Sequence, residues 1–258
     1  MDLDIKGLRV LVTAGANGIG LAIARSFVAE GARVHVCDVD GAALAGLTRT
    51  DPAFTHTICD VSDRAAVAKL FVEAKAALGG LDVLVNNAGI AGPTARVEEM
   101  NPEDWDHTIA ICLTGQFNCA RLAVPQLRAS DNPSIINISS MAGKVGFALR
   151  APYAAAKWAV VGFTKSLSIE LGPDNIRVNA ILPGLVSGDR QRRVLEAKAQ
   201  QSGISVKQME EKAFSYTSIK EYVTPEQVAD QIVFMASPRG RTISGQAIAI
   251  CGDMGMLG

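Results

Sequence analysis

Short runs of apolar and β-branched residues alternate along this chain with longer segments of helical periodicity. Several of the short runs are apolar on both faces, which is typical of parallel strands covered by helices on each side of a sheet. The predicted strands are Leu8 to Thr13, Arg33 to Cys37, Phe54 to Cys59, Asp82 to Asn86, Ser134 to Ser139, Ile176 to Leu182 and Ala247 to Cys251. The pattern therefore predicts an α/β fold with a doubly wound parallel sheet.

Signals for helix starts support this alternation. Asn101 stands before a proline at the first helical position, and Thr224 opens a capping-box sequence. A long helix is expected from Asp104 to Leu127. The least regular stretch runs from about Leu185 to Val223 and contains a further capping-box sequence at Ser205 to Gln208. We expect this segment, about 185–223, to form a small helical lid.

The length and composition bound the organisation of the chain. A chain of 258 residues with 48% hydrophobic content suits one substantial core, so we expect a single domain over 1–258. Its net charge of −1 gives no general attraction for nucleic acid or an anionic membrane surface. The first residues lack a secretory signal, and no stretch has the roughly eighteen uninterrupted apolar residues of a membrane span. A soluble, cytoplasmic protein with a small-molecule partner is expected.

The cysteines and histidines do not form a metal-binding pattern. Five cysteines, at positions 37, 59, 112, 119 and 251, lack the close pairing of a zinc site and the density of a disulfide-stapled secreted domain. The three histidines are His35, His56 and His107, and none has a second histidine or a cysteine pair that would complete a ligand set. We expect free thiols and no metal.

A glycine-rich turn follows the first predicted strand. The segment Thr13 to Gly20 contains Gly15, Gly18 and Gly20 and precedes the helical run Leu21 to Glu30. Glycine permits a tight strand-to-helix turn, and the missing Cβ lets a diphosphate approach the amides and the positive end of the helix. Such turns also serve the fold alone, so the turn by itself leaves both interpretations open.

Acidic residues at the ends of the next two strands extend this candidate dinucleotide site. Asp38 lies eighteen residues after Gly20, where a carboxylate can accept hydrogen bonds from both hydroxyls of an adenosine ribose. The carboxylate would repel a 2′-phosphate, and no Lys or Arg in the turn or just after Asp38 would neutralise that phosphate. The sequence therefore favours NAD over NADP. Asp60 and Val61 are expected to face the adenine.

Ser140, Tyr153 and Lys157 are the candidate catalytic residues. The spacing of Tyr153 and Lys157 puts both side chains on one helix face, where an ammonium can lower the pKa of a phenol from its usual value near 10. Ser140 ends an apolar strand, from which its hydroxyl can hydrogen-bond a substrate oxygen. This spacing also occurs on many helices without any catalytic role.

Taken together, these motifs resemble the short-chain dehydrogenase/reductase family over essentially the whole chain. The matches, in order, are Thr13 to Gly20 (with Ala14 between Thr13 and Gly15), Asn86 to Gly89, Ser140, Tyr153, Lys157, Asn179 and Pro183-Gly184. The resemblance implies a seven-stranded Rossmann-like fold, Tyr153 as acid/base, Lys157 as its activator and ligand of the nicotinamide ribose, Ser140 as substrate orienter, and a homotetramer or dimer. The cofactor-binding residues expected overall are Gly15, Asn17, Gly18, Ile19, Gly20, Asp38, Asp60, Val61, Asn87, Ala88, Gly89, Tyr153, Lys157, Pro183, Gly184 and Val186.

Two positions depart from the family pattern. Cys112 stands where the family usually has an Asn that holds a water of the proton relay, and a thiol should hold such a water poorly. Cys112 can equally be a simple packing residue. Gly188 stands where a Thr commonly meets the nicotinamide carboxamide, and the preceding Ser187 is a candidate substitute.

The sequence thus predicts an NAD-dependent oxidoreductase that transfers a hydride between a secondary alcohol and NAD. The expected pocket walls, 90–94 and 141–150, are largely apolar and suit a cyclic or aromatic substrate, whereas four arginines near the mouth suit a carboxylate. Those arginines are Arg150, Arg190, Arg192 and Arg193. A sugar or polyol substrate is equally consistent with the sequence. Two other classes remain: a non-catalytic NAD-binding sensor or scaffold, and a lyase or epimerase using bound NAD.

Overall fold

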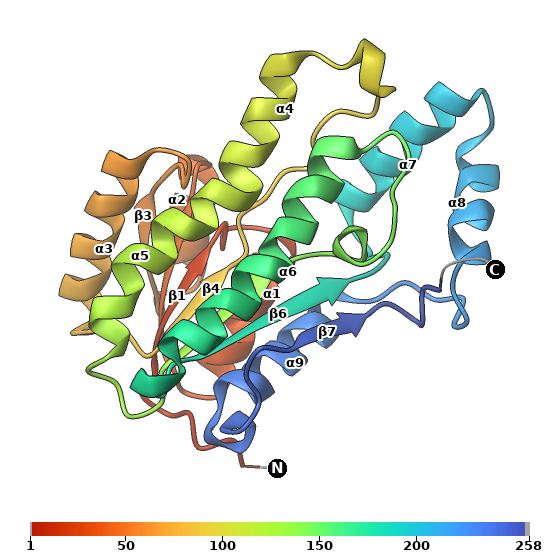
Figure 1. Ribbon diagram of the computed structural model, residues 1–258. Helices are drawn as coiled ribbons and strands as arrows, with labels where there is room; N and C mark the ends of the chain where they lie inside the picture. Colours follow the sequence, from red (N-terminus) through yellow and green to blue (C-terminus); the bar gives the residue numbers. More distant parts are fainter. Residues whose placement is uncertain (1, 256–258) are drawn as a thin grey trace.

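The seven predicted strands form one parallel sheet, in the order β3-β2-β1-β4-β5-β6-β7, in a computed structural model that describes residues 2–255 (Figure 1). The chain builds the sheet outward from β1 to β3, then returns to the other side of β1 with β4. The carboxyl ends of β1 and β4 therefore border the point where the strand order reverses, which is where open α/β sheets bind ligands. The strands are β1 (Arg9–Thr13), β2 (Arg33–Asp38), β3 (Phe54–Ile58), β4 (Val83–Asn86), β5 (Ser134–Ile138), β6 (Arg177–Pro183) and β7 (Ala247–Ile250).

Helices cover both faces of this sheet, as the apolar strands predicted (Figure 1). One core lies among α1, α2, α9 and the sheet, and a second lies among α3, α5, α6 and the opposite face. In β1 the buried side chains alternate between them, with Val10 and Val12 in the first core and Leu11 in the second. The helices are α1 (Gly18–Ala29), α2 (Gly41–Thr50), α3 (Arg64–Leu78), α4 (Pro102–Ile109), α5 (Gly115–Leu127), α6 (Ala151–Leu171), α7 (Asp189–Ser202), α8 (Val206–Ser215) and α9 (Pro225–Ala236). Both predicted capping boxes, at Ser205 and Thr224, are confirmed, as is the Asn101 cap.

The long helix predicted from Asp104 to Leu127 is interrupted. Between α4 and α5 the chain makes a π-helical turn, η2 (Ala110–Thr114), which contains Cys112. After this turn Gly115 packs so closely on Val61 that a Cβ would lie 2.5 Å from the Val61 Cγ2 atom. A side-chain pattern with helical spacing does not distinguish one wider turn from the regular helix on either side.

The segment after β6 forms a helical hairpin of α7 and α8, which lies beyond the carboxyl ends of β6 and β7 (Figure 1). Its two helices bury a small core of their own around Leu195, Ala199 and Met209. The ends of the segment are joined, because the Ser187 amide donates to the Val223 carbonyl at 2.9 Å. The segment predicted to be a lid is thus an ordered helical hairpin whose two ends meet just after β6.

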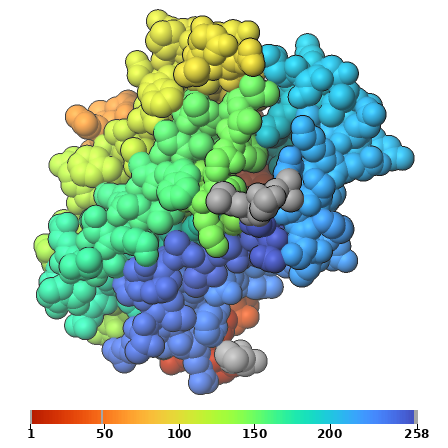
Figure 2. All heavy atoms as spheres, turned by 45° about the vertical axis from the view of Figure 1, so that its right-hand side comes forward, coloured from red at the N-terminus to blue at the C-terminus, as the bar shows by residue number. Residues whose placement is uncertain are grey.

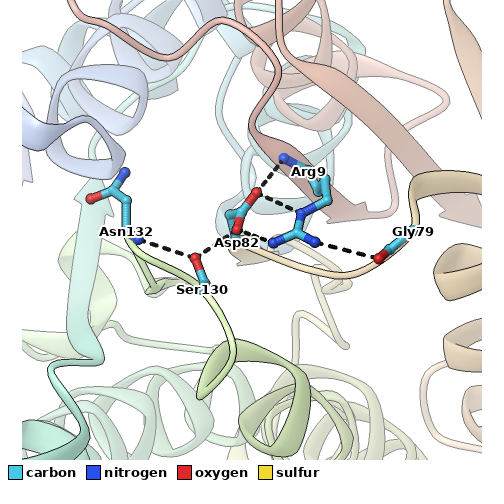
Figure 3. Close-up of polar contacts among 5 residues, drawn as sticks. All are labelled: Arg9, Gly79, Asp82, Ser130 and Asn132. Carbon is cyan, nitrogen blue, oxygen red and sulfur yellow. Dashed lines mark hydrogen bonds and ion pairs between the residues drawn. The ribbon is translucent and has the colours of Figure 1, made fainter.

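The opposite end of the sheet is held by an ion pair. Arg9, at the start of β1, donates from its Nη2 to Asp82 Oδ1 at 2.6 Å and from its Nε to Asp82 Oδ2 at 2.9 Å (Figure 3). The Ser130 hydroxyl donates to the same Oδ1, and the Asn132 amide donates to Ser130. This network joins β1 to the residues before β4 and β5, away from the candidate site.

Among the described helices, none is long and apolar enough to cross a bilayer.

Candidate active site

The glycine-rich turn between β1 and α1 is tightly packed on its inner side. A Cβ on Gly15 would lie 2.7 Å from Val36 Cγ1, and one on Gly20 would lie 2.0 Å from the Ala14 carbonyl oxygen. Both positions therefore require glycine. Ala14 itself has a left-handed backbone, with φ of +50°, which the sequence did not reveal. Gly18, at φ +54°, has no atom within 4 Å of a Cβ position, so the outer side of the turn is open.

The start of α1 is free to receive an anion. Asn17, which precedes the helix, makes no side-chain capping bond, whereas α2 and α3 are capped by Asp40 and Asp63. The amides of the first turn of α1 thus receive no capping bond from Asn17, and helix-start amides of this kind can bind an anion. Ile19 is half-buried beside them. These residues fit the diphosphate of a dinucleotide.

Asp38 lies at the end of β2, beside this turn. Its Oδ2 accepts from the Ala16 amide at 3.2 Å and its Oδ1 accepts from the Asp40 amide at 3.1 Å. These bonds fix the carboxylate at the edge of the turn while it stays half-buried. Its position fits the adenosine ribose of the same dinucleotide.

Asp60 and Val61 follow β3. Asp60 Oδ1 accepts from both the amide and the hydroxyl of Ser62, so its carboxylate shapes the turn after the strand. Val61 is buried, and its carbonyl accepts from Asn118 Nδ2 at 3.0 Å. Both residues have a structural role here, and the adenine contact that the sequence suggested stays a prediction.

The carboxyl ends of β1 and β4 are fastened together by Asn87. Its Nδ2 donates to the carbonyls of Thr13 and Ala14, each at 3.0 Å. The amides of Asn87 and Ala88 both donate to the Thr13 hydroxyl. A Cβ on the next residue, Gly89, would lie 3.4 Å from Lys157 Nζ and 3.5 Å from Cys112 Sγ. Asn87 and Ala88 thus bind the end of β1 beside the glycine turn, and Gly89 lies next to the candidate catalytic Lys157.

Pro183, Gly184 and Val186 lie at the carboxyl end of β6 and just after it. The Gly184 amide donates to the Ile250 carbonyl at 2.9 Å, and a Cβ on Gly184 would lie 2.7 Å from Cys251 Cα. Val186 pairs with Val223 where the lid begins. The backbone from β6 into the lid is therefore held against β7.

Ser140, Tyr153 and Lys157 are brought together at the carboxyl end of β5. Lys157 is buried in α6, and its Nζ donates to the Ile138 carbonyl at 2.8 Å and lies 5.7 Å from the centre of the Tyr153 ring. Burial raises the pKa of Tyr153, but the nearby charges of Lys157 and Arg190 and a hydrogen bond from Ser140 outweigh it and lower the pKa below its usual value of 10. The arrangement can therefore hold a phenolate.

Arg150 is a close neighbour of Tyr153. Its guanidinium carbon lies 4.9 Å from the centre of the Tyr153 ring, and that of Arg190 lies 5.9 Å from it. Of the arginines expected at the mouth, Arg192 is instead paired with Asp189 and Glu196 on the exposed side of α7. Lys198, also on α7, was not singled out from the sequence, because its contact with Phe147 joins distant segments.

A cleft of about 360 Å³ lies between the loop after β4 and the start of the lid. Gly89, Ala91 and Thr94 line one side, and Arg190, Arg193 and Val194 line the other. Figure 2 shows the lid, in cyan, beside the green segment that leads into α6. Arg190 spans the cleft, since its Nη1 donates to the Gly89 carbonyl at 3.1 Å.

The two departures from the family pattern have local explanations. Cys112 is fully buried in the π-helical turn, where its thiol accepts from the Ile90 amide at 3.3 Å and donates to the Ile90 carbonyl at 3.5 Å. Gly188 has φ of +131° immediately before α7, a conformation that L side chains rarely adopt. A threonine at that position would be strained.

Within residues 2–255, no three His, Cys, Asp or Glu side chains form a metal-binding group.

Comparisons with known proteins extend over nearly the whole chain. A family model described as enoyl-(acyl carrier protein) reductase matches residues 13–256. The chain is 36% identical over 247 residues to D-beta-hydroxybutyrate dehydrogenase of Cupriavidus necator, covering 93% of this chain and 95% of that protein. It is 37% identical over 254 residues to trans-4-hydroxycyclohexanecarboxylate dehydrogenase of Sinomonas cyclohexanicum, covering 94% and 90%. A variant of actinorhodin polyketide ketoreductase, crystallised with NADPH, superposes with a TM-score of 0.90 at 33% identity, covering 96% of this chain and 97% of that one.

Proposed function

The chain belongs to the short-chain dehydrogenase/reductase family and is an oxidoreductase of CH–OH groups that uses a nicotinamide cofactor, and from this premise we propose that it oxidises a secondary alcohol with NAD. The observation that carries the proposal is the group of Ser140, Tyr153 and Lys157 at the carboxyl end of β5, with the pKa of Tyr153 lowered. Two relatives whose names describe the oxidation of secondary alcohols support it.

In this mechanism the Tyr153 phenolate accepts the hydroxyl proton of the substrate. Lys157 stabilises the phenolate electrostatically, and Ser140 donates a hydrogen bond to the substrate oxygen as a carbonyl forms. When bound, NAD supplies the acceptor for the hydride that leaves the carbinol carbon. The products are the ketone, NADH and the neutral Tyr153 phenol, which returns its proton to solvent.

Gly15, Asn17, Gly18, Ile19 and Gly20 would hold the diphosphate of NAD, and Asp38 would bind the hydroxyls of its adenosine ribose. The preference for NAD rests on the Asp38 carboxylate, which would repel a 2′-phosphate, and on the absence of Lys or Arg from the Gly15 to Gly20 turn. The remaining contacts would come from Asp60, Val61, Asn87, Ala88, Gly89, Tyr153, Lys157, Pro183, Gly184 and Val186.

We further propose that residues 1–258 act as one catalytic unit, with 185–223 as its lid, in a cytoplasmic homo-oligomer. The support for an oligomer is a set of exposed apolar side chains on helices α5 and α6: Phe117, Trp158 and Ile169. Trp158 and Ile169 are three turns apart on one side of α6. Light scattering should report a smaller particle for Trp158→Glu than for the unchanged protein, and equal masses would contradict this interface.

The catalytic proposal is tested with Tyr153→Phe, assayed by NADH absorbance against secondary alcohols, hydroxy acids, cyclic alcohols and polyols. The variant should lose about 10²- to 10⁴-fold in kcat, because the proton acceptor is gone, with little change in NAD affinity. Tyr216→Phe, an exposed tyrosine in the lid, is the matched control and should keep full activity.

Three outcomes would contradict the proposal. Unchanged kcat in Tyr153→Phe would exclude this residue as the acid/base. If the unchanged protein binds NAD but oxidises no alcohol of the panel, it is a sensor or scaffold. Turnover with co-purified NAD and no net change in its redox state would indicate a lyase or epimerase.

A further inference from the structure

Three basic side chains from two separate segments gather around Arg150, and two of them, Arg150 and Arg190, lie beside Tyr153. We propose that this basic cluster, Arg150, Arg190 and Lys198, binds a carboxylate of the substrate, so that the alcohol is a short hydroxy acid. The inference rests on the proposed function, because it places the anion relative to the hydroxyl that Tyr153 would deprotonate. Arg150 is the central ligand in this proposal.

Arg150 is buried without a carboxylate partner, and the acidic group that faces it is the phenol of Tyr153. Only 2% of its surface is exposed, and its Nη2 donates to the carbonyl of Ala91, which lines the cleft. Its Nε is buried and has no hydrogen-bond partner. Burial lowers the pKa of Arg150, which reflects the cost of holding this charge away from water. An incoming carboxylate would supply both the missing charge and an acceptor for a free N–H group.

Arg190 and Lys198, both on α7, lie close to Arg150. Arg190 lies close enough to lower the pKa of Arg150 further, and Lys198 has its pKa lowered to about 8 by burial and by the charges of Arg150 and Lys212. Lys198 Nζ also lies 3.8 Å from the centre of the Phe147 ring, on which Arg150 packs as well. The three cations are thus held together despite their mutual repulsion.

No acidic side chain offsets these charges within residues 2–255. Neither Arg150, Arg190 nor Lys198 forms an ion pair with any described Asp or Glu. Of the three, Arg190 lines the cleft, together with glycine, apolar residues, Thr94 and Arg193, and no carboxylate lines it. Clustered cations that repel each other, one of them with an unused buried donor, indicate a site built for an anion.

The geometry limits how far the carboxylate can be from the reacting carbon. The Arg150 guanidinium carbon is 4.9 Å from the Tyr153 ring centre, so a molecule that touches both groups has few bonds between its acid and its alcohol. The planar fork of Arg150 matches a carboxylate. We therefore place the hydroxyl a few carbons from the acid, as in 3-hydroxybutyrate.

Anion binding is measured first without any variant or turnover. Isothermal titration of the protein with NAD present should show that butyrate binds at least tenfold more tightly than butyramide, which has nearly the same shape without the charge. Equal affinities, or no binding of butyrate, would overturn the carboxylate site. This result does not depend on catalysis, so a failure of the proposed function would remain distinguishable from a failure of the anion site.

Substrate preference is the second measurement. The ratio of kcat/KM for 3-hydroxybutyrate to that for 3-hydroxybutyramide should exceed ten in the unchanged protein and fall at least tenfold in Arg150→Gln. Arg150→Lys should restore part of the ratio. Arg192→Gln, an exposed arginine of α7 paired with Asp189, is the control and should leave both rates unchanged.

A purely structural role for Arg150, as a support for the Tyr153 ring, would slow both substrates equally. An unchanged ratio in Arg150→Gln would therefore overturn the proposal even if both rates fell. If Arg150→Gln does not fold, which its thermal transition would reveal, the titration with butyrate and butyramide decides.

Discussion

The Arg150 guanidinium lies over the ring of Tyr153, with 4.9 Å between the guanidinium carbon and the ring centre. A cation over an aromatic face is stabilised by the ring, and ionisation of the tyrosine raises the pKa of Arg150 against the opposing effect of burial. The acid/base candidate and the anion-site candidate are therefore electrostatically coupled. A substitution in the basic cluster should change the pKa of Tyr153.

Replacing Arg190 should move the pH dependence of alcohol oxidation. Oxidation needs the Tyr153 phenolate, so kcat/KM rises with pH through the pKa of Tyr153, which is lowered from its usual 10. The charge of Arg190 contributes to that lowering, so Arg190→Gln should raise the pKa of Tyr153 and shift the rise to higher pH. The profile is measured with the neutral substrate 3-hydroxybutyramide, so that carboxylate binding does not enter.

Arg193→Gln is the control for this prediction. Arg193 also lines the cleft but is not among the groups that shift the pKa of Tyr153. Its profile should coincide with that of the unchanged protein. A profile that stays in place in Arg190→Gln would show that Tyr153 does not control the pH dependence.

Much of the fold was predictable because its signals are local. The strands could be located from apolar runs, and the caps at Asn101, Ser205 and Thr224 from a few adjacent residues. Tyr153 and Lys157 share one helix, so their spacing alone placed them together. The sequence-based strand ends differ from the structure by one residue at most, for example at Asp38 and Pro183.

The rest depends on contacts between distant segments. The π-helical turn at Cys112 keeps helical spacing in the sequence, and the contact of Lys198 with Phe147 joins the lid to the loop before α6. Arg150 was predicted near the mouth, but its burial against Tyr153 depends on how α6 packs on η2 and the loop after β4. Gly188 was unexplained until its backbone angle showed that glycine is required there.

Asp38→Asn should weaken the discrimination between the two nicotinamide cofactors. The amide can still accept from the Ala16 amide, but it no longer repels a 2′-phosphate. The ratio of kcat/KM with NAD to kcat/KM with NADP should fall by about tenfold or more, equivalent to about 1.4 kcal/mol. Asp40→Asn, at the cap of α2, is the matched control. An unchanged ratio in Asp38→Asn would remove the basis for NAD preference.

Acidification should destabilise the protein through His35 before its carboxylates protonate. His35 Nδ1 lies 2.8 Å from the Thr55 hydroxyl oxygen and Nε2 lies 3.0 Å from that of Thr57, and Thr57 donates to Glu73. Thr57 therefore accepts from Nε2, and the neutral imidazole satisfies both bonds. Burial is the main cause that lowers the pKa of His35 from 6.5 to about 4.

Between these two values the unfolded chain binds a proton that the folded protein does not. The free energy of unfolding should therefore fall by about 3 kcal/mol as the pH drops from about 6.5 to about 4. Urea denaturation at a series of pH values measures this slope. His35→Gln should flatten it, whereas His107→Gln, at an exposed histidine that does not shift the pKa of His35, should not. A slope that survives in His35→Gln would assign the acid sensitivity to other groups.

Ala14→Gly should stabilise the protein. Ala14 holds φ of +50° at the start of the glycine-rich turn, a left-handed conformation that costs an L-residue about 1–2 kcal/mol. Glycine removes that cost but adds about 0.4–1 kcal/mol of conformational freedom to the unfolded chain, so the expected net gain in stability is up to about 1.6 kcal/mol. Gly18→Ala gives the reverse comparison, because Gly18 has φ of +54° and no neighbour within 4 Å of a Cβ. Its net loss, the backbone cost of about 1–2 kcal/mol less the reduced freedom of the unfolded chain of about 0.4–1 kcal/mol, should be up to about 1.6 kcal/mol. Chemical denaturation without cofactor measures both variants, and a less stable Ala14→Gly would mean that the Ala14 methyl group contributes packing that outweighs the backbone strain.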